Sequence, residues 1–132
     1  MAVGFTGTRH GMTEAQIATF LTLLPEYCGP FHHGDCKGAD AQASDLASQW
    51  RLVISHPPTD EKLRAFTPWS TVVLPSKPYI ERNHDIVDAC DVLIGCPGEM
   101  TEQLRSGTWA TIRYARKIGK KVVVIYPDGT VE

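Results

Sequence analysis

Short apolar runs alternate with segments of helical periodicity along the whole chain. The apolar runs have the length and the β-branched or aromatic character of strands, and they are Ala2–Phe5, Phe31–His33, Leu52–His56, Asp91–Gly95 and Lys121–Tyr126. Helical patterns fill the intervals, with one helix beginning after Thr13, the next two at Ala39–Trp50 and Tyr79–Ala89, and a last one after Ser106. Buried strands that alternate with helices predict an α/β fold with a parallel sheet covered on both faces.

The first helix has the clearest start signal. Thr13 and Gln16 have the spacing of a capping box, and apolar residues follow at Ile17, Phe20, Leu21 and Leu24, which is the spacing of one helical face. Pro25 is expected to end or kink this helix.

The segment 57–78 is the least regular part of the chain. It is rich in proline and contains the aromatic residues Phe66 and Trp69, so we expect a long ordered loop with at most a short strand at Thr71–Leu74. The 132 residues show no internal repeat and no linker, and their number is typical of one domain. We therefore predict a single domain over residues 1–132.

Composition restricts the function classes. The formal net charge is -2 and both signs are mixed along the chain, so an electrostatic surface for duplex nucleic acid is not expected. No leader pattern and no apolar stretch of membrane-spanning length is visible, and we expect a soluble cytoplasmic protein that does not bind membranes.

The cysteines do not indicate disulfides or a metal site. The four residues Cys28, Cys36, Cys90 and Cys96 form no Cys-x-x-Cys pair and are expected to be reduced. A zinc site would have to use His32, His33 and Cys36 with His56, but this spacing matches no structural zinc pattern. We expect neither a metal nor a cofactor.

Polar turns follow three of the predicted strands. They are Thr6-Gly7-Thr8-Arg9, the segment Gly34–Asp40 and the segment Ser106-Gly107-Thr108. In a parallel sheet these turns lie at the same edge, where ligands bind. Glycines, hydroxyls and the amides of a helix N-terminus are typical of a phosphate site, although a Ser N-cap alone is also common in helices that bind nothing.

Several charged or polar residues lie in or near these turns. Arg9 beside a turn of glycine and hydroxyls favours an anionic partner. Asp40 is either a ligand residue or an ordinary acid in a first helical turn, and Lys37 is either a ligand residue or solvated. Arg82 and Asn83 lie in the first turns of a helix after the irregular segment, which favours a ligand role, with a surface position for one of them as the alternative.

The order of these motifs resembles the SLOG superfamily of nucleotide-binding domains, and within it the YspA-like group. The resemblance is carried by "TGTR", "HGDCKGAD", "RN", "ACDVLIGCPG", "SGT" and "YARKIGKKVVVIYP", and it covers nearly the whole chain. It implies a three-layer, Rossmann-like, doubly wound parallel sheet and a homo-oligomer, with Asp35 standing where the family motif has a glycine.

The resemblance also implies a pocket for a nucleotide or a nucleotide-derived molecule. Together with the turns above, it assigns the pocket to Thr6, Gly7, Thr8, Arg9, Gly34, Asp35, Lys37, Gly38, Asp40, Arg82, Asn83, Ser106, Gly107 and Thr108.

Related LOG-type phosphoribohydrolases and nucleoside deoxyribosyltransferases use a glutamate to break an N-glycosidic bond. The position that matches the LOG glutamate is Thr111, and a hydroxyl cannot stabilise the positive charge that develops on the sugar. Glu99, Glu102 and Asp40 are the candidate replacements. We therefore predict a binding domain, with an N-glycosidic-bond hydrolase as the alternative; a DNA-binding domain is disfavoured by the acidic balance.

Overall fold

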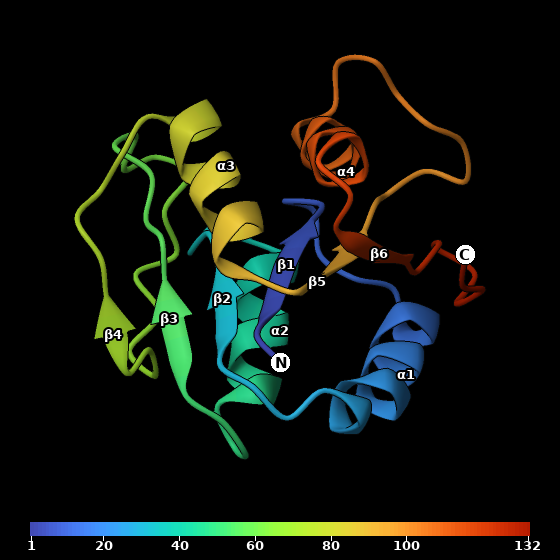
Figure 1. Cartoon of the computed structure of the whole chain (residues 1–132), viewed down its shortest axis with the longest axis horizontal. Helices are drawn as coiled ribbons and strands as arrows, with labels where there is room; N and C mark the ends of the chain where they lie inside the picture. The colour runs from blue at the N-terminus through green and yellow to red at the C-terminus, as the bar shows by residue number, and fades with distance from the viewer.

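A computed structural model describes residues 1–132. Its centre is a six-stranded sheet in the order β4-β3-β2-β1-β5-β6, and every neighbouring pair of strands is parallel. The strands are β1 Val3–Gly7, β2 Phe31–His33, β3 Val53–Ser55, β4 Val72–Val73, β5 Val92–Cys96 and β6 Lys121–Val124. The predicted α/β class with a doubly wound parallel sheet is confirmed (Figure 1).

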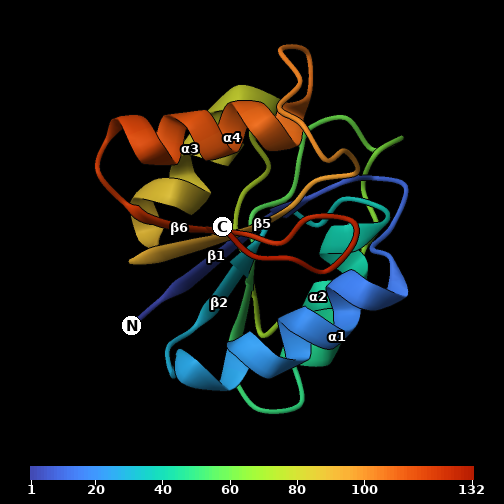
Figure 2. The same cartoon turned by 90° about the vertical axis from the view of Figure 1, so that its right-hand side faces the viewer.

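Four α-helices cover the sheet. They are α1 Glu14–Leu23, α2 Ala39–Ala47, α3 Tyr79–Ala89 and α4 Gly107–Lys117, and a short 3-10 turn, η1, follows α1 at Leu24–Glu26. Figure 2 shows α1 and α2 on one face of the sheet and α3 and α4 on the other, which gives three layers. None of these helices combines the length and the apolar character that crossing a membrane requires.

The local signals in the sequence have clear structural counterparts. Thr13 caps α1, because its side chain accepts from the Gln16 amide while the Gln16 side chain accepts from the Thr13 amide. Pro25 lies in the 3-10 turn that ends this helix. The expected boundaries that differ most are three strand or helix ends. α2 ends at Ala47, β1 continues to Gly7, and β6 ends at Val124, where Ile125 bridges back to Val131.

Each face of the sheet has its own apolar core. On the α1 and α2 face, the rings of Phe5, Phe20 and Phe31 lie 5.7 to 6.0 Å apart, centre to centre. On the α3 and α4 face, Trp109 is 2 % exposed and belongs to the core. Burial on both faces explains why the strands are continuous apolar runs.

The strand order reverses between β1 and β5. The chain proceeds from β1 through β2 and β3 to β4, then crosses by way of α3 to β5 on the other side of β1. All five residues of β1 pair with β5, from Val3 with Val92 to Gly7 with Cys96. In doubly wound sheets a crevice forms at the carboxyl ends of the strands at this point.

Candidate functional site

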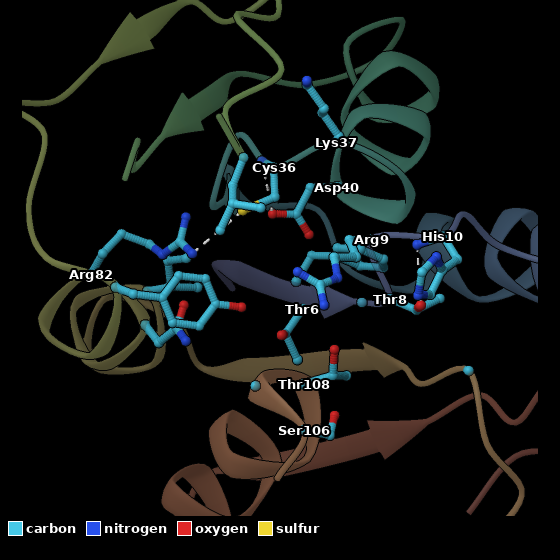
Figure 3. A pocket seen from close by; sticks show the side chains of 18 of the residues that line it. Thr6, Thr8, Arg9, His10, Cys36, Lys37, Asp40, Arg82, Ser106 and Thr108 are labelled. Carbon is cyan, nitrogen blue, oxygen red and sulfur yellow. Dashed lines mark hydrogen bonds between the residues drawn. The ribbon is translucent and has the colours of Figure 1, made fainter. Parts of the chain in front are cut away.

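A cavity of about 560 Å³ lies at this reversal point. Its volume is within the range of small-molecule sites in proteins. It is lined by Phe5, Thr6, Gly7, Thr8, Arg9, His10, Cys36, Lys37, Asp40, Leu63, Tyr79, Arg82, Asn83, Ile86, Gly98, Glu99, Arg105, Ser106, Gly107 and Thr108. Figure 3 shows Arg9, Asp40, Arg82 and Thr108 around one hollow, although they come from four different segments of the chain.

The turn after β1 is tied to its neighbours through its backbone. The Thr8 amide donates to the Cys96 carbonyl at 3.1 Å, and the Thr8 carbonyl accepts from the Ala39 amide at 2.9 Å. A Cβ on Gly7 would lie 2.6 Å from the Ala39 side chain, so glycine is needed here for the approach of α2. The turn is therefore fixed, and it holds Thr6 and the exposed Arg9 at the cavity.

The turn after β2 is built around Asp40. The Asp40 Oδ2 atom accepts from the amides of Gly34 at 3.1 Å and Cys36 at 3.3 Å. The residue is 6 % exposed, and burial raises the pKa of its carboxyl to about 6, against the opposing effects of Arg82 and the two amides. Asp40 is thus a buried carboxyl that titrates near neutral pH at the edge of the cavity.

Arg82 on α3 is the most deeply buried cation of the cavity. It is 2 % exposed, donates to the carbonyls of Gly34 and His56, and contacts the Cys36 sulfur at 3.5 Å. Its Nε atom has no hydrogen-bond partner, and Arg82 takes part in none of the ion pairs of the protein. Asp40 acts on this cation electrostatically without forming an ion pair with it, so an anion in the cavity would stabilise the residue further.

The ring of Tyr79 connects this cation to the third turn. The Arg82 Cζ atom lies 4.6 Å from the centre of the Tyr79 ring. The Tyr79 hydroxyl lies against Gly107, where a Cβ would approach it to 2.6 Å. One wall of the cavity therefore extends from Arg82 to the start of α4.

The N-terminus of α4 presents free hydrogen-bond donors. The Ser106 side chain caps the helix by accepting from the Trp109 amide at 3.2 Å, while the amides of Gly107 and Thr108 have no acceptor in the protein. Thr108 is 7 % exposed, and its hydroxyl also has no hydrogen-bond partner. Free amides, a free and accessible hydroxyl and the positive end of the helix dipole together suit an anion.

The three candidate acids lie in different places. Asp40 and Glu99 line the cavity, and a Glu99 carboxylate oxygen accepts from the Trp109 indole at 3.1 Å. Glu102 does not line it, because it pairs with Arg113 at 2.8 Å on the surface. Thr111 donates to the Gly107 carbonyl at 2.9 Å, so it stabilises the helix start instead of acting on a ligand.

Three predicted ligand residues do not line the cavity. Gly34 and Gly38 shape the turn, since a Cβ on Gly34 would meet the Arg82 guanidinium and one on Gly38 would meet the Arg9 carbonyl. Asp35 is buried with its carboxylate bound to the loop that follows β3, through Arg64 at 3.0 Å and Thr67 at 3.0 Å and 2.9 Å. The expected ligand role of Asp35 is therefore replaced by a structural one.

The other predicted residues line the cavity, together with several that the sequence reasoning missed. The missed polar residues are His10, Cys36, Tyr79 and Arg105. The sequence held a signal for three of them, because His10, Cys36 and Arg105 adjoin or lie within its motifs, whereas Tyr79 lies three positions before Arg82. Leu63 had no such signal, since it reaches the cavity from the irregular segment.

The clustered histidines form a buried hydrogen-bonded pair. His32 Nδ1 lies 2.8 Å from His56 Nε2, and His33 is fully buried beside them. Burial lowers the pKa of all three residues, to about 4 for His33 and His56. No group of three or more metal-ligating side chains is present in the protein, so the zinc interpretation has no structural support.

No family profile and no curated protein sequence matches the chain. Solved structures do. The molybdenum cofactor binding protein from the phototrophic bacterium Rippkaea orientalis is 19 % identical with a TM-score of 0.71, over 95 % of this chain and 76 % of that one. The structural-genomics target TM1055 is 19 % identical with a TM-score of 0.61, over 92 % of this chain and 71 % of that one. At this identity the likeness concerns the fold.

Proposed function

We propose that this protein binds a phosphorylated small molecule of the nucleotide class in the cavity between β1, α3 and α4. The observation that carries the proposal is the set of free donors at the start of α4, the amides of Gly107 and Thr108 and the Thr108 hydroxyl, in a cavity that also contains the buried Arg82 guanidinium. Basic residues outnumber acids in the lining, with Arg9, Lys37, Arg82 and Arg105 against Asp40 and Glu99. A dianionic phosphate would satisfy the donors and compensate the cations at once.

The cavity suits a molecule larger than phosphate alone. Its volume of about 560 Å³ leaves room for a sugar and a further group beside the helix terminus. The structural neighbour from Rippkaea orientalis is described as a cofactor-binding protein, which supports small-molecule binding in a fold of this kind. The phosphate is assigned to Gly107 and Thr108, and the neutral part of the molecule to the region near Asp40.

The alternative is hydrolysis of an N-glycosidic bond. Two carboxyls, Asp40 and Glu99, share the cavity, and the raised pKa of Asp40 suits a proton donor near neutral pH. However, Glu99 is held by the Trp109 indole, and the position of the family glutamate is occupied by Thr111. Binding without turnover is therefore the preferred function.

Calorimetric titration with the common ribonucleoside monophosphates tests the proposal. The wild-type protein should bind at least one of them, and Thr108→Val, which replaces the free hydroxyl with a methyl group, should weaken that binding about tenfold. The matched control is Thr22→Val on the exposed face of α1, which should bind like the wild type. The proposal is overturned if no member of the panel binds, or if Thr108→Val binds as tightly as the control.

Chromatography of the same mixtures decides between the two functions. Intact nucleotide after prolonged incubation supports binding. Release of free base that is lost in Glu99→Gln or Asp40→Asn would instead establish the hydrolase.

A further inference from the structure

Asp40 has two carboxylate oxygens with different surroundings. Oδ2 accepts two main-chain hydrogen bonds in the turn after β2, from the amides of Gly34 and Cys36. Oδ1 has no hydrogen-bond partner in the protein, and Asp40 is one of the residues that line the cavity. The protein thus holds one carboxylate oxygen in a fixed position with its acceptor capacity free.

The charge of the cavity restricts what this oxygen can meet. A phosphate close to Asp40 would be repelled, and the free amides of Gly107 and Thr108 with the cations Arg9 and Arg105 offer it a better place. The part of the ligand beside Asp40 must therefore be uncharged and must donate hydrogen bonds. Sugar hydroxyls and the N–H edge of a base are the donors that a nucleotide offers.

The geometry of the carboxylate favours hydroxyls. The N–H edge of guanine presents two parallel donors, which suit both oxygens of a carboxylate in a bidentate arrangement. Here Oδ2 is already occupied by two amides, so only Oδ1 remains. A single acceptor oxygen is well suited to one hydroxyl or to two neighbouring hydroxyls of a ribose.

On this basis, which rests on the proposed function, we propose that Asp40 Oδ1 accepts a hydrogen bond from a ribose hydroxyl and makes the site selective for ribose over deoxyribose phosphates. The cavity would then bind its ligand at two points, with the phosphate at the start of α4 and the sugar at the start of α2. The charge of Arg82 lowers the pKa of Asp40 against the larger effect of burial and so favours the ionised carboxylate.

The experiment compares each ribonucleoside monophosphate of the panel with its 2′-deoxy and 3′-deoxy counterparts by calorimetry at about pH 8, where the Asp40 carboxyl is ionised. The wild-type protein should bind the best ribonucleotide about tenfold more tightly than at least one of its deoxy forms. This ratio needs no variant, so it does not depend on how a substitution affects folding.

Asp40→Asn then identifies the residue responsible. The amides of Gly34 and Cys36 require an acceptor, so the asparagine oxygen should stay on them and its NH2 group should face the cavity. The variant should bind ribo and deoxy forms with nearly equal affinity, while Asp45→Asn on the exposed side of α2 should keep the wild-type ratio.

The outcomes separate this inference from the proposed function. If no nucleotide binds to the wild type, the proposed function fails and the inference fails with it. If nucleotides bind and Thr108→Val weakens them, but ribo and deoxy forms bind equally, only the inference is overturned. An affinity that depends on the base but not on the sugar hydroxyls also overturns it.

Discussion

The guanidinium of Arg82 on α3 donates a hydrogen bond to the main-chain carbonyl of Gly34 at the end of β2. The same nitrogen also reaches the His56 carbonyl at 3.3 Å, just after β3. A residue of the helix that crosses to β5 therefore fixes the ends of two strands on the other side of β1. Nη1 makes both of these bonds, while Nη2 contacts the Cys36 sulfur, so the planar guanidinium joins three separate partners.

We expect Arg82→Lys to lower the free energy of unfolding by about 1 to 3 kcal/mol, since one ammonium cannot replace the buried fork and leaves carbonyls without donors. Urea denaturation followed by circular dichroism measures the change. The matched control is Arg105→Lys, an exposed residue of the same cavity, which should change stability by less than about 0.5 kcal/mol. Equal effects at the two positions would contradict the bridging role of Arg82.

Gly38 should tolerate no side chain. It precedes α2 with φ 91° and ψ -126°, and a Cβ there would collide with the Arg9 carbonyl. We expect Gly38→Ala to destabilise the protein by about 2 to 4 kcal/mol, combining backbone strain with a steric clash. Gly119→Ala separates the two effects, because Gly119 has φ +81° with open space around it and should lose only about 1 kcal/mol. Thermal unfolding of both variants provides the comparison.

Asp35 should matter for the loop after β3 and not for the ligand. Its carboxylate forms an ion pair with Arg64 and accepts hydrogen bonds from the amide and the hydroxyl of Thr67. Asp35→Asn removes this partly buried ion pair and should lower the free energy of unfolding by about 1 to 3 kcal/mol. Limited proteolysis should cut the segment 57–78 faster, while nucleotide affinity should stay within about twofold of wild type. Asp60→Asn in the same segment is the control, since its amide oxygen can keep the contact with the Lys62 amide.

The architecture was predictable because its signals are local. Continuous apolar strands, the capping box at Thr13 and Gln16, and polar residues directly after the strands each depend on near neighbours in the chain. The same signals predicted that Arg9, Asp40 and Thr108 lie at one edge of the sheet, because the carboxyl ends of parallel strands lie at the same edge, and all three line the cavity.

The partners of the buried charges were not predictable, because they are distant in sequence. Asp35 and Arg64 are 29 positions apart, and Arg82 and Gly34 are 48 apart. The sequence placed both Asp35 and Arg82 in motifs of the same apparent kind, yet the Asp35 carboxylate is bound by a loop and the Arg82 guanidinium forms no ion pair. Only the path of the irregular segment decides between these outcomes.

His33 should make stability depend on pH. It is fully buried on β2, and burial, reinforced by Arg82 and the neighbouring histidines and opposed by Asp35, lowers its pKa from 6.5 to about 4. The unfolded chain therefore binds a proton that the folded protein does not bind between about pH 6.5 and pH 4. The stabilisation is complete above about pH 6.5 and is lost as the pH falls through this window.

Between pH 7 and pH 5 this one residue should remove about 2 kcal/mol from the free energy of unfolding. His33→Asn should reduce the pH dependence of the free energy of unfolding by that amount. The smaller asparagine lowers stability at every pH, but its side-chain oxygen can still accept a hydrogen bond from the Asp35 amide.

Ser70→Ala is the control. It removes the hydroxyl that contacts His33 Nε2 but keeps the imidazole, so it should retain the wild-type slope. Asp40, whose pKa is raised to about 6, changes stability in the opposite direction over this range, but it does so equally in all three proteins. Urea titrations at the two pH values measure the slopes, and a wild-type slope in His33→Asn would show that the buried ring is not the group that titrates.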